Sequence, residues 1–123
     1  AIQLKPDYAE PRVGLGAALL RAERPVEAIP HYREALRLGP KLAEAHNGLG
    51  AALAMQGKKD EAMAEYERAL RLKPLPSAHL NIALLLIEKG DVGAARRHLE
   101  SALSIDPGYA PAMQALRAIT PGP

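Results

Sequence analysis

The sequence repeats itself at an offset of 34 residues. Residues 27–40 read EAIPHYREALRLGP and residues 61–74 read EAMAEYERALRLKP, so the offset is 61 − 27 = 34. Extending the match outward aligns residues 9–42 with residues 43–75, and residues 76–109 follow as a third, more divergent copy. Self-similarity at this period is typical of stacked arrays, in which each copy buries its apolar face against the next. The repeat therefore predicts a stack of like units.

Each copy contains two helical patterns, which predicts a helical hairpin. In the first pattern a small residue stands where a neighbouring helix must come close: Gly16, Gly50 and Ala83 in the three copies. The second pattern has spacings of four and then three, which place its members on one helix face. Its members are Ala28, Tyr32 and Ala35, then Ala62, Tyr66 and Ala69, then Ala95, Leu99 and Ala102. Aromatic residues make up only 3% of the chain, and a core rich in Ala and Leu favours closely spaced helices. We predict an all-α fold.

Glycine and proline mark the ends of the predicted helices. Gly57 and Gly90 fall where the first helix of a copy must end, a position that favours a left-handed backbone, whereas copy one has Glu23 to Pro25 there. Prolines that close the second helices stand at Pro40, Pro74 and Pro107, because proline disfavours helix at the preceding residue. Pro6 falls one period earlier (40 − 34 = 6), which predicts that the chain begins inside a preceding hairpin. Pro30 lies inside a second helix, where we expect a kink or a late start.

These motifs resemble the tetratricopeptide repeat family, whose pattern runs Leu-Gly, a large residue three on, then Ala, an aromatic four on, Ala three on, and a closing Pro. The resemblance implies an α-solenoid of antiparallel helix hairpins stacked in a right-handed superhelix. It divides the chain into the end of a preceding repeat (1–8), three repeats (9–42, 43–75 and 76–109), an extra or capping helix (110–120) and a tail (121–123). Where the family often has Trp, this chain has Arg12, His46 and His79.

The composition narrows the classes of function. The chain has no cysteine, which excludes disulfides and thiolate metal sites. Its 16 basic and 14 acidic residues leave a net charge of +2, too small to predict a nucleic-acid partner. No apolar run approaches the roughly 20 residues of a membrane span. We expect a soluble protein without membrane insertion, cytoplasmic by default because the sequence shows no targeting signal.

No catalytic, cofactor or metal site is predicted. His46 and His79 recur at one repeat position, and His31 and His98 recur at another. Equivalent positions in adjacent repeats should lie about 8 to 10 Å apart, whereas two zinc ligands each lie about 2 Å from the metal. The sequence also has no phosphate-binding glycine loop and no serine elbow. We therefore expect a protein that is not an enzyme.

The family resemblance implies that the first helices line a concave groove holding a peptide or a partner's helix. By register the groove residues are Val13, Ala17, Leu20 and Arg21 in copy one, Asn47, Ala51, Ala54 and Met55 in copy two, and Leu80, Asn81, Leu84, Ile87 and Glu88 in copy three. This lining is largely apolar, with two amides and a charged residue at each rim. We expect it to accept an apolar or amphipathic segment, read through anchors three and four residues apart. Leucines at such positions also serve packing.

Two binding modes known in the family can be compared with these residues. Members that bind a chaperone's C-terminal carboxylate use cations on the first helices. The corresponding residues here supply no cation, which disfavours this mode: Val13, Ala17, Gly48, Ser77 and Asn81. Arrays attached to glycosyltransferases hold peptide backbone with a repeated groove Asn. Here Asn81 matches that position, while the other copies have Gly14 and Gly48.

Two other functions stay open at this point. The end of the chain near Ile2 and Leu4 has no polar cap in the sequence, so a self-associating scaffold or homo-oligomer could form through that face. Alternatively, the half-repeat start suggests the substrate-recruiting arm of a larger enzyme, such as a glycosyltransferase.

Overall fold

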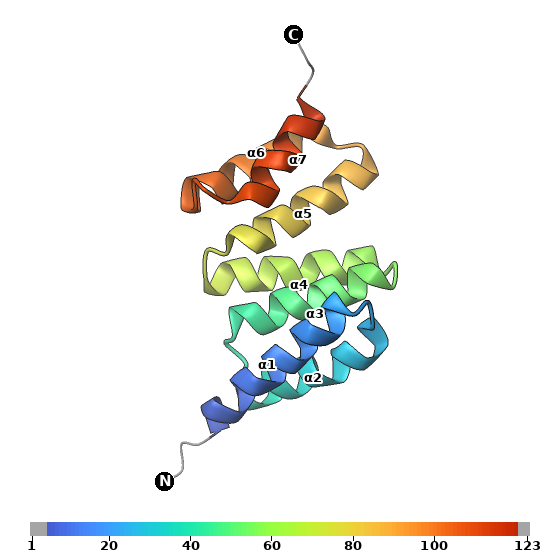
Figure 1. Ribbon diagram of the computed structural model, residues 1–123, viewed down its shortest axis with the longest axis vertical. Helices are drawn as coiled ribbons and strands as arrows, with labels where there is room; N and C mark the ends of the chain where they lie inside the picture. The colour runs from blue at the N-terminus through green and yellow to red at the C-terminus, as the bar shows by residue number, and fades with distance from the viewer. Residues whose placement is uncertain (1–4, 121–123) are drawn as a thin grey trace. The chain divides into compact units, whose positions relative to one another are not determined.

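The computed structural model describes the backbone of residues 5–120 and the side chains of residues 9–120. These residues form seven α-helices and no strand (Figure 1). The helices are α1 (Lys5–Arg21), α2 (Pro25–Leu38), α3 (Ala43–Met55), α4 (Lys59–Leu72), α5 (Pro76–Lys89), α6 (Val92–Ile105) and α7 (Ala110–Ile119). The chain divides into two compact units, residues 1–73 and residues 74–123. The predicted all-α class is confirmed.

The first unit consists of two helical hairpins. Helix α1 pairs with α2 and α3 pairs with α4, while α3 also contacts α2 and α1. The second helices contribute the predicted face to the core, because Ala28, Ala35, Ala62 and Ala69 are fully buried. The two tyrosines of that face, Tyr32 and Tyr66, are each only 2% exposed. The repeat motif therefore fills the interior of this unit.

The glycines of the first helices make room for these tyrosine rings. A Cβ atom added at Gly16 would lie 2.7 Å from Cε2 of Tyr32, and one added at Gly48 would lie 2.2 Å from Cε1 of the same ring. Tyr66 stands in the same way against Gly50, where the corresponding distance to Cε1 is 2.6 Å. Both edges of the Tyr32 ring thus lie against glycine, one on α1 and one on α3. The small residues predicted at close helix approaches have a direct steric reason.

The second unit consists of the α5–α6 hairpin followed by α7, which packs on α6. Its core contains Ala83, Ala95, Leu99, Ala102 and Ala112, all fully buried. Leu99 stands at the repeat position that Tyr32 and Tyr66 occupy in the first unit. A leucine fills this position where copy three has Ala83 in place of the glycine.

The hairpin turns share one backbone conformation. Gly57 and Gly90 have φ angles of +81° and +88°, which confirms the predicted left-handed turns. Glu23 stands at the equivalent position of the first hairpin and also has a positive φ, +60°. In each turn the next residue donates its backbone N–H to the carbonyl five residues earlier: Arg24 to Leu19, Lys58 to Leu53 and Asp91 to Leu86, at 2.8 to 2.9 Å. The turn is the same even where the sequence lacks glycine.

The prolines act at both ends of helices. Helices α2, α4 and α6 each end two residues before Pro40, Pro74 or Pro107, as predicted. The expectation for Pro6 differs from the structure, since α1 begins at Lys5 and Pro6 lies in its first turn. There the missing N–H of proline would have no helical partner in any case. Of the expected end of a preceding repeat (1–8), residues 5–8 belong to α1, and residues 1–4, with Ile2 and Leu4, lie outside the described residues.

Pro30 lies inside α2, and that helix already begins at Pro25, so the expected late start is wrong. The ring nitrogen of Pro30 has no hydrogen to donate to the carbonyl of Val26, four residues earlier. The Val26 side chain is 69% exposed, so this part of the helix faces solvent. Water can therefore reach the turn that proline weakens.

Candidate functional site

The predicted groove residues lie on the first helix of each hairpin, and none of them is buried. In the first unit they lie on α1 (Val13, Ala17, Leu20 and Arg21) and on α3 (Asn47, Ala51, Ala54 and Met55); in the second they lie on α5 (Leu80, Asn81, Leu84, Ile87 and Glu88). Intervening residues of the same helices, such as Leu49 and Ile82, are 3% exposed and face the core. Met55 and Leu84 are 46% and 45% exposed. Each first helix therefore has one packed face and one accessible, largely apolar face.

Two of the predicted groove residues also serve packing. Leu80 and Ile87 are partly buried against the core cluster of the second unit. Leu84, between them on α5, is the most accessible large apolar side chain among the predicted groove residues of the second unit. In the second unit, Leu84 is therefore the residue that best separates a contact with a partner from a contact with the core.

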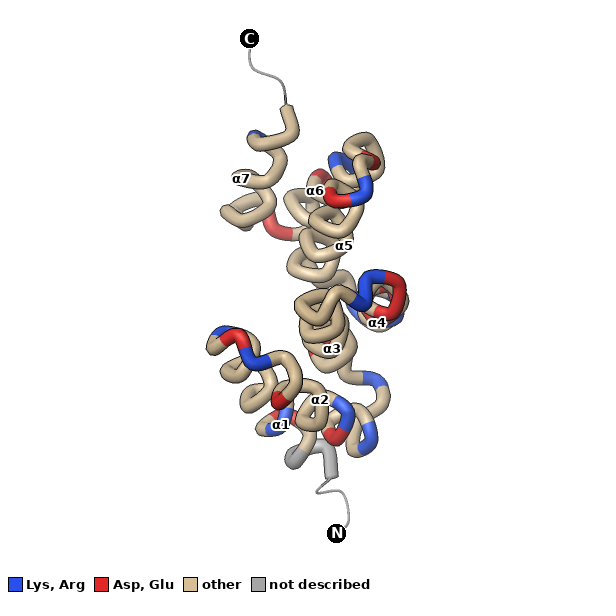
Figure 2. Tube along the Cα trace, turned by 90° about the vertical axis from the view of Figure 1, so that its right-hand side faces the viewer, with Lys and Arg blue, Asp and Glu red and all other residues tan. Residues whose placement is uncertain are grey.

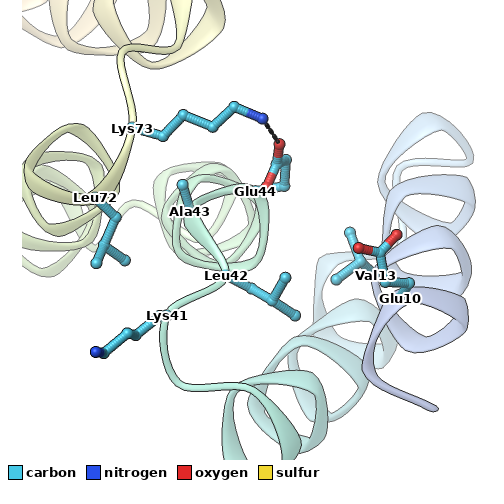
Figure 3. A pocket seen from close by; sticks show the side chains of 8 residues that line it. All are labelled: Glu10, Val13, Lys41, Leu42, Ala43, Glu44, Leu72 and Lys73. Atoms are coloured by element: carbon cyan, nitrogen blue, oxygen red, sulfur yellow. Dashed lines mark hydrogen bonds and ion pairs between the residues drawn. The ribbon is translucent and has the colours of Figure 1, made fainter. Parts of the chain in front are cut away.

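The first unit contains a pocket of about 460 Å³ beside the predicted face (Figure 3). It is lined by Glu10, Val13, Lys41, Leu42, Ala43, Glu44, Leu72 and Lys73. Only Val13 among these residues belongs to the predicted groove. The others come from the first half of α1, the α2–α3 connection, the start of α3 and the end of α4. Repeat register could not identify them, because it selects positions within one helix and this pocket collects the ends of several.

The pocket has an apolar floor and a charged edge. Leu42 and Leu72 supply aliphatic surface, and Leu72 is 42% exposed. At the edge, the Nζ atom of Lys73 donates to Oε2 of Glu44 at 3.0 Å, as the dashed line in Figure 3 shows. This hydrogen bond holds the pKa of the Glu44 carboxyl below its usual value. The pocket can therefore offer apolar contact beside charges of both signs.

The second helices carry a solvated charged surface. Figure 2 shows both acidic and basic residues on α4. Arg68 and Arg37 each pair with a glutamate three residues earlier, Glu65 and Glu34. Exposed pairs at this spacing stabilise a helix by only a few tenths of a kcal/mol. This face supports the helices and shows no convergence of reactive groups.

A polar pair joins the two helices of every hairpin at the same repeat position. Each pair spans 19 residues: Arg12 Nη1 lies 3.3 Å from His31 Nδ1, His46 Nδ1 lies 2.8 Å from Glu65 Oε1, and His79 Nδ1 lies 3.0 Å from His98 Nδ1. A comparison of histidines between adjacent repeats could not predict these contacts, because each of them lies within one repeat. The recurring separation of 19 residues was the available signal.

The three pairs differ in chemistry. Glu65 accepts from both His46 and Arg68, the latter at 2.6 Å, so it is held by two donors. The imidazole rings of His79 and His98 have centroids 5.3 Å apart and are tilted by 38°. Burial, with a smaller contribution from His98, lowers the pKa of His79. Within residues 9–120, no group of three or more His, Cys, Asp or Glu side chains is placed to hold a metal ion.

Burial also perturbs the tyrosines. It raises the pKa of Tyr32 and of Tyr66, and for Tyr32 the charge of Arg21 partly opposes this rise. A tyrosine with a raised pKa stays protonated at neutral pH, which suits a packing role.

No helix within residues 5–120 combines the length and apolar character needed to cross a bilayer.

The tetratricopeptide repeat family model matches residues 1–43, 13–75 and 66–110, so the matches together extend over residues 1–110. The chain belongs to the tetratricopeptide repeat family. The helical hairpins, the turn glycines and the buried Ala-Tyr-Ala faces described above are the tetratricopeptide repeats of this chain. No curated protein matches it.

Several solved tetratricopeptide repeat structures are similar to this chain. YrrB, described as a protein "with an unusual peptide-binding site", is 26% identical with a TM-score of 0.76, over 89% of this chain and 57% of YrrB. The chain thus spans little more than half the length of YrrB. The Yersinia enterocolitica chaperone SycD in complex with a YopD peptide is 20% identical (TM-score 0.78, 92% of each chain). The first such domain of Spaghetti (RPAP3), bound to the HSP90 peptide SRMEEVD, is 18% identical (TM-score 0.83, 97% and 95%).

Proposed function

We propose that this chain is a non-catalytic protein-interaction module, which binds a peptide or a partner's helix along the exposed faces of its first helices. The observation that carries the proposal is the accessibility of the thirteen groove residues, while neighbouring positions on the same helices fill the core. Large apolar side chains such as Met55 and Leu84 remain nearly half exposed there. The peptide complexes of SycD and Spaghetti support it by analogy of fold.

The chemistry of these faces favours an amphipathic ligand. Aliphatic side chains supply the contact area, and an amphipathic helix would meet them through anchors three and four residues apart. Asn47 and Asn81 add amide groups that can both donate to and accept from a peptide. Arg21 on α1 and Glu88 on α5 each add a charge to the face of their own unit, which would contribute to the orientation of a ligand more than to its affinity.

The pocket of the first unit fits one anchor of such a ligand. Its volume of about 460 Å³ exceeds that of any single apolar side chain, and Val13, Leu42 and Leu72 give it an apolar surface. The Glu44–Lys73 ion pair at its edge can accept polar groups that flank the anchor. Val13 belongs to both the pocket and the groove prediction, so it connects the two surfaces.

The test begins with a displayed library of random peptides, selected on the wild-type chain, followed by titration of the selected peptides. Met55→Glu and Leu84→Glu are measured separately because the two residues belong to different units. The matched control is Ile105→Glu, which changes a residue of similar exposure, 40%, at the end of a second helix. Circular dichroism confirms that each variant folds.

We expect at least one groove variant to weaken binding by about fivefold or more, as buried interface anchors do, and the control to leave it unchanged. If the control weakens binding as much as both groove variants, or neither groove variant weakens it, the peptide binds elsewhere.

A further inference from the structure

Helix α1 carries an exposed apolar stripe outside the predicted groove. This outer stripe consists of Pro11, Gly14, Leu15 and Ala18, whose spacing places them on one face of the helix. All four residues are exposed, and Leu15 is 51% exposed although it is the leucine of the repeat motif. The groove positions 13, 17, 20 and 21 lie on a different side of the same helix. The outer stripe is therefore a second surface, separate from the groove.

Helix α3 has the same stripe at the same repeat positions, and there it is packed. The equivalent residues are Ala45, Gly48, Leu49 and Ala52, so three of the four are identical to those of α1. Leu49 is 3% exposed, and both alanines are fully buried. At Gly48 an added Cβ would lie 2.2 Å from the ring of Tyr32, which belongs to the preceding second helix, α2. At Gly14 the same Cβ would have no described atom within 4 Å. The stripe of α3 receives α2, and that of α1 is open.

Helix α7 uses this stripe in the second unit. Its members there are Ala112, Ala115, Leu116 and Ile119. Ala112 is fully buried, and the other three are partly buried against a core cluster. The second helix α6 contributes Ala95, Leu99 and Ala102 to that cluster, and α7 packs on α6. In each unit, then, one first helix docks through the stripe onto the second helix before it.

We propose that the outer stripe of α1 is a docking face for a single amphipathic helix of another protein, of the same type as α2. The two packed stripes define this helix. Its apolar face has Ala, then an aromatic residue or Leu four residues on, then Ala three residues further, as in Ala28, Tyr32 and Ala35. The aromatic ring of the docked helix fills the open space at Gly14, as Tyr32 fills the space at Gly48.

Burial of the second helices excludes a folded second copy as the source of this helix. The residues that would have to meet Gly14 are Tyr32, Tyr66 and Leu99, and each of them is at most 2% exposed in its own hairpin. A second copy could present such a face only by unfolding part of its core. The occupant is therefore a helix whose Ala-aromatic-Ala face is free.

The edge of the outer stripe adds a preference of charge. A pocket of about 390 Å³ opens there, lined by Pro11, Arg12, Leu15, Glu34, Arg37 and Leu38. Its leucines extend the apolar surface from α1 onto α2. Its two arginines outnumber its one glutamate, so the docked helix should carry an acidic residue at this edge.

The probe is a synthetic peptide with the sequence of residues 58–74, which is the second helix α4 with its flanking residues. A side-chain crosslink on the face opposite Tyr66 holds it helical, because an isolated helix of this length is marginal in water. Fluorescence anisotropy of the labelled peptide, titrated with the whole chain, measures the affinity. A peptide with Tyr66→Ala is the matched control for the ring.

We expect Leu15→Glu to weaken binding of the peptide by about tenfold or more, as loss of a buried anchor does. Gly14→Ala should weaken it by about fivefold, because the added Cβ takes the place of the ring. That variant keeps the helix intact, so circular dichroism should show an undiminished fold. The Tyr66→Ala peptide should bind about tenfold more weakly than the parent. Leu84→Glu, in the predicted groove of the second unit, should leave the affinity unchanged.

Three outcomes would overturn the proposal. The first is a peptide that does not bind, and the second is an affinity that Leu15→Glu and Gly14→Ala leave unchanged. The third concerns the occupant and is checked by light scattering of the chain alone. If the chain forms a dimer that Leu15→Glu dissociates, a second copy covers the outer stripe and the assignment to another protein is wrong.

Discussion

Gly48 and Gly14 occupy the same position in successive repeats, and the structure predicts opposite effects for the same substitution at each. Gly14 lies inside α1 with open space where a side chain would stand, because no neighbouring atom lies within 4 Å of its added Cβ. Gly48 lies inside α3, and its added Cβ would stand 2.2 Å from Cε1 and 2.3 Å from Cζ of Tyr32. An alanine at Gly48 must therefore displace the tyrosine ring or the helix.

The magnitudes decide which effect dominates. Replacing glycine by alanine in a helix interior stabilises it by about 1 kcal/mol, and this gain applies at both positions. At Gly48 the Cβ falls more than an ångström inside the ordinary contact distance of 3.4 Å. The ring cannot retreat freely, since its other edge lies against Gly16. Overpacking of this kind costs up to about 3 kcal/mol. We therefore expect Gly48→Ala to lower the free energy of unfolding by about 2 kcal/mol, and Gly14→Ala to raise it by about 1 kcal/mol.

Urea denaturation followed by circular dichroism measures both changes. With a urea dependence of about 2 kcal/mol per molar, Gly48→Ala should lower the midpoint by about 1 M. A Tyr32→Leu background provides the control, because it introduces the residue that copy three has at this position and should remove most of the Gly48→Ala penalty. The coupling energy between the two substitutions should then exceed about 1 kcal/mol. A Gly48→Ala protein that is as stable as the wild type would refute the steric argument.

Two further predictions concern a turn and an ion pair. Glu23 has a left-handed backbone, which costs a non-glycine residue about 1 to 2 kcal/mol. After the entropy of the unfolded glycine is subtracted, Glu23→Gly should therefore raise the free energy of unfolding by about 0.5 to 1 kcal/mol. Thermal denaturation measures this change, and Gly90→Ala, which should be destabilising, is the control for its sign. Because the hydrogen bond from Lys73 lowers the pKa of Glu44 below its ordinary 4.5, the pair stabilises the folded state above that pH and ceases to do so as the pH falls through the lowered pKa. Both side chains are about half exposed, so the effect is a few tenths of a kcal/mol, and Lys73→Met should remove this part of the acid dependence in urea titrations at several pH values.

Repeat spacing predicted the buried face of each second helix and the turns at Gly57 and Gly90, because packing and backbone sterics leave few residue types acceptable there. Pro6 shows where that reasoning stops. Proline is acceptable both just after a helix and in the first turn of one, so the residue alone does not distinguish an end from a beginning. Glu23 shows the same limit. The turn imposes a left-handed backbone there although glutamate disfavours it, so the residue's own preference did not predict the conformation.

The candidate site was predictable only where it follows helix register. The accessible faces of α1, α3 and α5 are turned away from the core faces by a fraction of a helix turn, so the same pattern that located the core also selected them. Their role in binding stays a prediction. The pocket near Val13 combines the ends of several helices, and the distance between such ends depends on how the hairpins pack. The polar pairs of Arg12, His46 and His79 could be predicted only from the geometry within one hairpin, because the spacing between repeats does not bring their partners together.

Positions at which the residue differs between the copies are those where one repeat can have a chemistry of its own. A residue such as Ala69 is enclosed on all sides, and any larger side chain would force helices apart. The position of the polar pair between the two helices of a hairpin requires only that its polar atoms have partners. The three repeats therefore have three different pairs there. Copy three departs furthest from the pattern, with Leu99 in place of tyrosine, and it also carries the His79–His98 pair and the exposed Leu84. A substitution scan of this chain for loss of binding should therefore find its strongest effects at exposed positions that differ between the copies, such as Leu84, whereas a scan for loss of stability should find them wherever the copies agree.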